Sequence, residues 1–259
     1  MRLISKAKES GVAMLEQARQ AFMALCSERG VNRATEVRVR PLMADEAVGT
    51  KAGPEFAIKR GKEVVIEATF KNSRGQAFTD CPSRWEGTLT GLLSLDLTNV
   101  RNRAVFVAAM NAVLRSLGAA GGTVHCRDDD LARCGEAIAR EIEKRFGKKR
   151  TCLIGLQPAI LKGLAFGFGC GRIAAVDLNP DNIGTWKLGV RICDGVTELP
   201  ELVEACDLGL ATGSTLINGT IDEIMARFAA AKKPLVFYGN TIAGAAALLR
   251  LERLCPFGQ

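Results

Sequence analysis

Apolar residues recur at helical spacing in two stretches of the first half of the chain. The first covers residues 6–29 and ends at Gly30, and the second covers residues 102–117 and ends at Gly118. A glycine directly after the last periodic position is a common helix C-terminus, because glycine adopts a positive φ without strain. Both stretches are therefore predicted to be amphipathic helices that pack one face on a core.

Between these helices, apolar and polar residues alternate, which is typical of half-buried antiparallel strands. The alternation predicts strands at residues 35–40, 55–59 and 63–70, with Gly61 in the turn between the last two. Residues 71–100 give no clear pattern. The first half of the chain is accordingly expected to form an α+β unit.

After a further helix that ends near residue 146, short apolar runs alternate with helical segments. This βαβ rhythm predicts a parallel sheet, in which ligands bind at the carboxyl ends of the strands. The five predicted strands of this sheet are residues 151–155, 172–177, 189–193, 208–212 and 234–238.

The most distinctive of these strand ends lies in the stretch 207–220, where an apolar run gives way to glycines, hydroxyls and an amide. Backbone N–H groups at a helix start, together with neighbouring hydroxyls, form sites for anions or polar ligands. Helix capping is the competing explanation, and it uses only one or two such groups. The candidate ligand-binding residues of this stretch are Thr212, Gly213, Ser214, Thr215 and Asn218.

Other strand ends carry further polar candidates. A proline suited to a first helical turn follows Gln157, which would aim the Gln157 side chain at a ligand. Asp177 closes the second strand about 20 residues after the first, where a carboxylate commonly binds a ribose hydroxyl. The same residue also fits a local Asx turn. Asn240 and Thr241 follow the last strand.

His125 is the only histidine of the chain, and Cys126 follows it directly. Histidine and cysteine are common ligands of transition metals, so both are candidate metal ligands. Adjacent residues of an extended chain point to opposite faces, which argues against one shared ion, and the spacing matches no recognised zinc pattern. A packed, structural histidine is the alternative.

Composition narrows the classes of function. The 259-residue chain is 47% hydrophobic and 24% charged, which is typical of a globular protein, and no apolar run is long enough to span a bilayer. The formal charge of +7 would attract nucleic acid, but no nucleic-acid motif accompanies it. Nine cysteines without a Cys-x-x-Cys pair, and an N-terminus unlike a secretory signal, predict reduced thiols and a cytoplasmic location.

Several motifs together resemble a known family. They lie at residues 98–104, 108–112, 124–126, 155–158 and 212–220. With them the chain resembles the putative heavy-metal chelation domains, which pair an enolase-N-terminal-like α+β domain with a Rossmann-like α/β domain. The loop after the last strand departs from the serine- and proline-rich loop of that family, which leaves the identity of the ligand open.

We therefore expect an α/β protein of two domains. Residues 1–120 are expected to form the enolase-N-terminal-like α+β domain, and residues 121–150 a connecting loop and helix. Residues 151–259 are expected to form the Rossmann-like parallel-sheet domain. The resemblance implies a binding site in the cleft between the two domains.

The leading hypothesis is that this cleft binds a small polar or metal-chelating ligand, with Arg103, Asn111 and His125 on one side and the strand-end residues on the other. One alternative is a transferase or methyltransferase-like enzyme that holds a nucleoside-type cofactor through Asp177. A second alternative is a non-catalytic interaction module. The sequence contains no evident nucleophile–base pair or complete set of metal ligands, so the choice between a transition metal and a nucleoside stays open, as does the oligomeric state.

Overall fold

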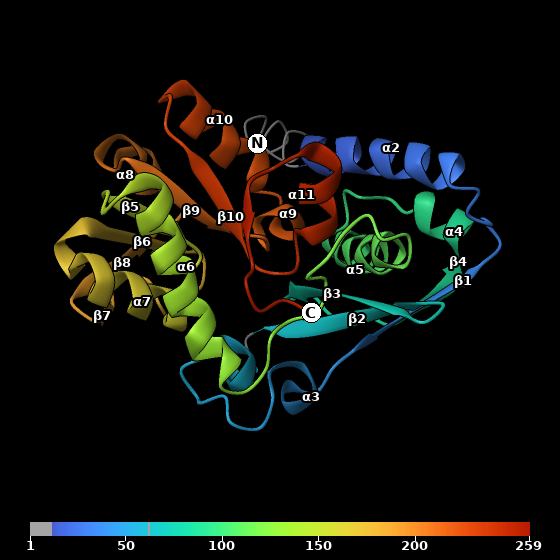
Figure 1. Ribbon diagram of the computed structural model, residues 1–259, viewed down its shortest axis with the longest axis horizontal. Helices are drawn as coiled ribbons and strands as arrows, with labels where there is room; N and C mark the ends of the chain where they lie inside the picture. Colours follow the sequence, from blue (N-terminus) through green and yellow to red (C-terminus); the bar gives the residue numbers. More distant parts are fainter. Residues whose placement is uncertain (1–11, 62) are drawn as a thin grey trace.

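The computed structural model describes residues 12–61 and 63–259, which form two sheets with helices around and between them (Figure 1). One is a four-stranded antiparallel sheet in the order β3-β2-β1-β4. The other has seven strands in the order β11-β10-β9-β5-β6-β8-β7, and within it only β7 and β8 pair antiparallel among the described residues. The predicted α/β class is confirmed.

The first half of the chain contains the antiparallel sheet and the helices that cover it. Its elements are α2 (Ala13–Glu28), β1 (Glu36–Pro41), α3 (Ala44–Val48), the 3-10 helix η1 (Ala57–Arg60), β2 (Val64–Phe70), β3 (Ser73–Thr79), β4 (Trp85–Thr88), α4 (Leu89–Leu93), α5 (Val100–Ser116) and α6 (Asp130–Phe146).

The strand predicted at residues 55–59 is wrong. This segment forms the 3-10 helix η1, in which Lys59 N–H donates to the Phe56 carbonyl and Gly61 N–H donates to the Ile58 carbonyl. Phe56 and Ile58 gave the strand-like pattern, but the backbone of this segment forms local hydrogen bonds from residue i+3 to residue i and joins no sheet. The predicted start of the first helix at residues 6–11 lies outside the described residues.

Helix α5 lies across the antiparallel sheet and is buried over all of residues 103–114. The sequence predicted one apolar face, but a helix enclosed on every side needs small and apolar residues all round. Close packing against the sheet depends on Gly75 of β3, because a Cβ there would lie 2.2 Å from the backbone nitrogen of Ala112. Other elements cover the opposite face of α5, including α11 (Ala243–Leu249).

The second half of the chain builds the larger sheet. Its remaining elements are β5 (Thr151–Ile154), α7 (Pro158–Phe168), η2 (Cys170–Arg172), β6 (Ile173–Asp177), β7 (Trp186–Lys187), β8 (Val190–Asp194), α8 (Leu199–Ala205), β9 (Leu208–Thr212), α9 (Thr215–Asn218), α10 (Ile221–Ala230), β10 (Leu235–Tyr238) and β11 (Arg253–Leu254).

One hydrophobic core joins the two halves. Phe22 and Phe106 of the first half belong to the same buried cluster as Ile154 and Phe237 of the parallel sheet. Burial of apolar surface between the halves therefore stabilises their relative position. The domain boundaries expected from the sequence stay a prediction.

The start of α2 and the C-terminal tail also connect the halves. The Asp222 carboxylate of α10 accepts hydrogen bonds from the backbone N–H groups of Ala13 and Met14, at 3.0 and 2.9 Å, and so caps α2. At the other end, Gln259 exchanges two backbone hydrogen bonds with Val124. Figure 1 shows α2 running beside α11, far from it in sequence.

Candidate functional site

Four neighbouring parallel strands, β10, β9, β5 and β6, end at the same edge of the larger sheet. The chain passes from β5 to β6 on one side, whereas β9 lies on the other side of β5. The strand order therefore reverses between β5 and β9. In open α/β sheets such a switch point is where ligands bind, because the loops after the two strands diverge and leave a crevice.

Gly155, the residue after β5, packs closely against the ends of β9 and β10. The Tyr238 hydroxyl donates a hydrogen bond to the Gly155 carbonyl at 2.7 Å. Gly155 has a φ of 85°, and a Cβ at this position would lie 2.5 Å from Cγ2 of Thr212. Only glycine therefore fits both the backbone conformation and the space at the switch point.

The carboxylate of Asp177 organises the end of β6. It accepts hydrogen bonds from the backbone N–H groups of Leu156 and Asn179, at 2.9 and 2.7 Å, and from the side chain of Asn182 at 3.3 Å. The bond from Asn179 is the Asx turn that the sequence allowed. Asn182 is buried, and its Oδ1 atom has no hydrogen-bond partner among the described residues.

Glu63, which directly precedes β2, brings a second carboxyl group into the range of Asp177. Burial, followed by the negative charges of Asp177 and Asp80, raises the pKa of Glu63 to about 7, and Arg60 acts weakly in the opposite direction. The pKa of the buried Tyr238 is also raised, chiefly by its burial. The switch point thus holds a carboxyl group that titrates near neutral pH.

Gln157, predicted as a ligand contact, serves as the N-cap of α7 in the structure. Its side-chain oxygen accepts a hydrogen bond from the backbone N–H of Ile160 at 2.7 Å and caps α7. Pro158 at the first helical position has no N–H to satisfy, so the cap serves the third helical residue, which is still in the first turn. The side chain of Gln157 folds back on its own helix.

Most polar groups of the stretch 212–220 bind each other. Thr215 is buried and donates to the Thr212 carbonyl at 2.7 Å, while Asn218 accepts from both the backbone and the hydroxyl of Thr220. Ser214 precedes α9 without a side-chain capping bond. Gly213 allows close packing, because a Cβ there would lie 2.8 Å from the Ile242 nitrogen. The hydroxyls of Thr212 and Ser214, both partly exposed, are the groups best placed for a ligand.

Asn111 links the two halves of the chain with its whole amide group. Its nitrogen donates to the carbonyls of Gln76 and Thr241, each at 3.0 Å, and also approaches the Asn240 carbonyl at 3.3 Å. Its oxygen accepts from the Gly244 N–H at 2.7 Å. Because the side chain is fully buried and its donors and acceptor are engaged, it acts on the protein itself.

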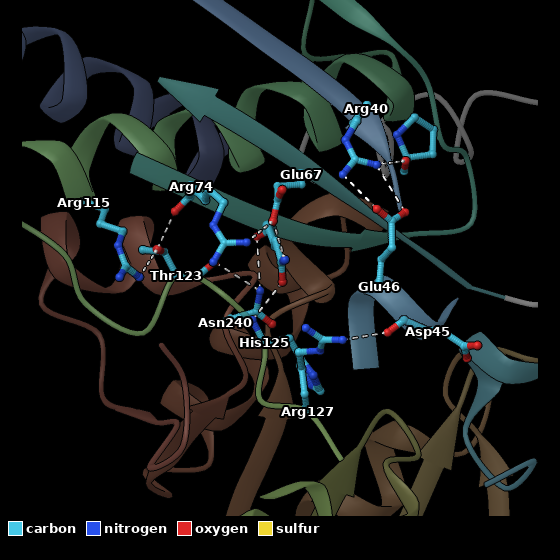
Figure 2. Close-up of polar contacts among 12 residues, drawn as sticks. Arg40, Asp45, Glu46, Glu67, Arg74, Arg115, Thr123, His125, Arg127 and Asn240 are labelled. Atoms are coloured by element: carbon cyan, nitrogen blue, oxygen red, sulfur yellow. Dashed lines mark hydrogen bonds and ion pairs between the residues drawn. The ribbon is translucent and has the colours of Figure 1, made fainter. Parts of the chain in front are cut away.

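Asn240 and Thr241 are buried next to Asn111. Figure 2 shows Asn240 close to Thr123 and His125, below the strands that carry Glu67 and Arg74. The Asn240 side chain is 3.4 Å from the Thr123 carbonyl, and its Oδ1 atom is buried without a partner among the described residues. The Thr241 hydroxyl accepts a hydrogen bond from the backbone of β3.

Arg103 makes a similar connection at the far side of α5. Its guanidinium donates to the carbonyls of Leu97 and Thr98, at 3.1 and 3.0 Å, and to the carbonyl of Ile217 in α9 at 2.5 Å. Burial lowers the pKa of Arg103. The three carbonyls account for a structural role without a ligand.

The Cys126 thiol contacts that of Cys134, and Cys255 lies within electrostatic range, but in the described part of the chain these residues form no metal site. Within the described residues no group of three or more His, Cys, Asp or Glu side chains is placed to hold a metal ion. The His125 ring bonds to the Cys126 carbonyl at 2.6 Å and packs edge-on against Phe78. Burial lowers the pKa of His125 to about 4, so the ring is neutral at pH 7. The packed histidine described as an alternative matches these contacts.

Local sequence patterns do not single out Glu63 or Tyr238 as site residues. Glu63 occupies a position that reads as the exposed start of a strand, and no local signal indicates its neighbour Asp177, which is distant in sequence. Tyr238 is the only tyrosine of the chain and the last residue of a predicted parallel strand. The only feature of the sequence that pointed to Tyr238 as a site residue was its hydroxyl at the end of a predicted strand.

Residues 139–250 match the model of the DUF364 family, described as "Putative heavy-metal chelation", and the resemblance predicted from the motifs is confirmed. The chain is similar to a DUF364 protein of unknown function from Pyrococcus horikoshii, with 17% identity and a TM-score of 0.48, over 87% of this chain and 78% of that one.

A DUF364 protein of unknown function from Desulfitobacterium hafniense is similar over 73% of each chain, with 13% identity and a TM-score of 0.45. No curated protein matches the sequence. In the described part of the chain, no helix has the length and apolar character required to cross a membrane.

Proposed function

We propose that this protein binds a small polar ligand that chelates a metal ion, at the carboxyl ends of β5, β6, β9 and β10. The observation that carries the proposal is the approach of Glu63 to Asp177 beside the switch point. Two neighbouring, partly buried carboxylates repel each other unless a proton or a cation compensates their charge. At neutral pH the site therefore favours a cationic group between them.

A metal complex suits this site better than a free ion. The described residues contain no group of three metal-ligating side chains, whereas protein metal sites ordinarily offer three or four donors. A chelating molecule supplies the remaining donor atoms itself. The hydroxyls of Thr212 and Ser214, which are partly exposed, would bind its polar groups. The description of the matching family supports the metal in this proposal.

A nucleoside-type cofactor held by Asp177 is the competing proposal. Its support is the position of Asp177 at the end of the strand next to β5. Against it, the two oxygens of Asp177 already accept three hydrogen bonds from the protein, and Glu63 adds a negative charge beside the place of the ribose. A cationic metal complex would instead be attracted by the negative charge of Glu63.

Calorimetric titration at pH 7.5 with Ni²⁺ alone, histidine alone and the cationic Ni²⁺–histidine complex tests the proposal. The complex is expected to bind more tightly than either component, and Glu63→Gln is expected to weaken it at least tenfold. The matched control is Glu204→Gln, an exposed glutamate of α8 for which no side-chain pairing is seen in the described part of the chain. Unchanged affinity in Glu63→Gln, or tighter binding of adenosine than of the complex, would contradict the proposal.

A further inference from the structure

A groove of about 770 Å³ lies away from the strand ends, between α6, the loop 119–121, α11 and the C-terminal segment. In the view of Figure 1, β10 lies between α6 and α11. Ligand sites for small molecules commonly measure about 300–1,000 Å³. The groove is therefore large enough for a small organic ligand.

The groove has an apolar lining. Ala119 and Ala120 lie on one side, Ile138 of α6 on another, and Ala246 and Leu251 near α11. Small side chains at the ends of two helices and a loop leave the volume open. An apolar body of a ligand would gain free energy by leaving water in contact with these residues.

Positive charge is concentrated on the same groove. Its charged lining residues are Arg140, Lys144, Arg145 and Arg253, with Glu141 the only acidic one. Arg145 is paired with Glu141 at 2.5 Å and with Glu252 at 2.7 Å.

Two of these cations are not neutralised. Arg253 donates to the carbonyls of Gly121 and Gly122, at 3.2 Å each, and within the described residues it is paired with no carboxylate. Lys144 is exposed and forms no ion pair with another described residue. The field over the groove therefore favours an anion.

We propose that this groove binds a small amphipathic anion, a molecule with an apolar body and a carboxylate or phosphate head. The apolar body lies over the alanine and leucine residues, and the head lies between Lys144 and Arg253. Neither residue belongs to the strand-end site, so this inference does not depend on the proposed metal-complex site. A zwitterion or a cation of the same shape would lose the attraction of both residues.

Titration calorimetry below the micellar concentration tests this site with dodecanoate and dodecyl phosphate. Dodecyltrimethylammonium provides the cationic counterpart, and acetate provides the head without the body. Both anionic amphiphiles are expected to bind at least tenfold more tightly than the cation, with acetate binding weakest. A large preference between dodecanoate and dodecyl phosphate identifies the head group. Equal binding of the cation and the anions would overturn the proposal.

Two variants locate the binding. Lys144→Glu reverses an unpaired exposed charge and is expected to weaken dodecanoate at least tenfold. Lys162→Glu, on the exposed face of α7, is the matched control and should leave affinity unchanged. Ala247→Trp at an exposed position fills the groove and should abolish binding without a change in circular dichroism. Unchanged affinity in both groove variants would show that the amphiphile binds elsewhere.

Discussion

The side-chain oxygen of Asn111 accepts a hydrogen bond from the backbone N–H of Gly244, 2.7 Å away, across the interface between α5 and α11. A Cβ at position 244 would lie 2.8 Å from that oxygen, so the glycine makes room for the bond. A residue in the middle of one helix thus fixes the start of another, 133 positions later in the chain. The Asn111 amide group therefore cross-links the two halves of the chain.

Asn111→Ala is expected to lower the free energy of unfolding by about 2–4 kcal/mol, because the buried Thr241 carbonyl and Gly244 N–H lose their Asn111 partner, while the Gln76 carbonyl keeps only the hydrogen bond from Asn240 at 3.4 Å. Urea denaturation followed by circular dichroism measures the change. Asn102→Ala on the same helix removes a single bond to the Asp96 carbonyl and is the control. A loss of less than about 1 kcal/mol in Asn111→Ala would contradict the structural role.

The titration of Glu63 should make the protein less stable as the pH rises from about 4.5 to 7. The folded pKa is about 7 and the ordinary value 4.5, so the folded state binds the proton more tightly than the unfolded state does. Stability is therefore fully present below pH 4.5 and is lost as the pH rises through 7, by up to about 3 kcal/mol. Glu63→Gln should remove this loss, and Glu204→Gln should retain it in denaturation measured at each pH.

The titration of His125 should make the protein less stable as the pH falls, opposite to the effect of Glu63. Its folded pKa is about 4, below the ordinary 6.5, so stability is present above pH 6.5 and is lost as the pH falls toward 4. Since the chain has one histidine, NMR gives one imidazole Cε1–H signal. Its chemical shift should stay constant between pH 8 and 5.5 in the folded protein and should titrate near 6.5 in urea. A folded-state midpoint above 6 would show that the ring is accessible to solvent.

Ser214→Ala and Thr215→Ala should separate ligand binding from stability. Thr215 donates a buried hydrogen bond, so its loss should destabilise the unliganded protein by about 1–2 kcal/mol. Ser214 makes no side-chain capping bond, so Ser214→Ala should keep the melting temperature. If the proposed site is correct, Ser214→Ala should reduce the thermal shift given by the Ni²⁺–histidine complex. Equal shifts in wild type and Ser214→Ala would place the ligand away from α9.

The cysteines should react in the order of their exposure. All nine are free thiols, and Cys170 is exposed, whereas Cys26 is buried with its pKa raised by burial to about 11. The thiolate is the reactive form, so Cys170 should be alkylated first and Cys26 only after unfolding. Mass spectrometry after timed iodoacetamide treatment measures the order, with Cys170→Ser as the control. Disulfides in rapidly quenched native lysate would contradict the prediction of reduced thiols.

Local patterns in the sequence determined much of the fold. Helices ending near Gly30 and Gly118, and the parallel strands β5, β6, β8, β9 and β10 after residue 150, follow from periodicity and turn chemistry, which act over a few residues, whereas the short strands β7 and β11 were not predicted. The same reasoning placed Asp177 and Thr212 at strand ends. It failed at residues 55–59, where a short apolar alternation fits either a strand or a 3-10 helix, and the backbone closes its hydrogen bonds locally.

Tertiary structure decided what the polar residues do. Asn111 reads from the sequence as a candidate ligand contact, but packing against Gly244 and the Thr241 carbonyl uses its amide completely. Glu63 carries no signal of its own, because its raised pKa arises from burial and from Asp177, more than a hundred residues away. Hydrogen-bond capacity and desolvation depend on which groups the whole fold brings together, and no local pattern contains that information.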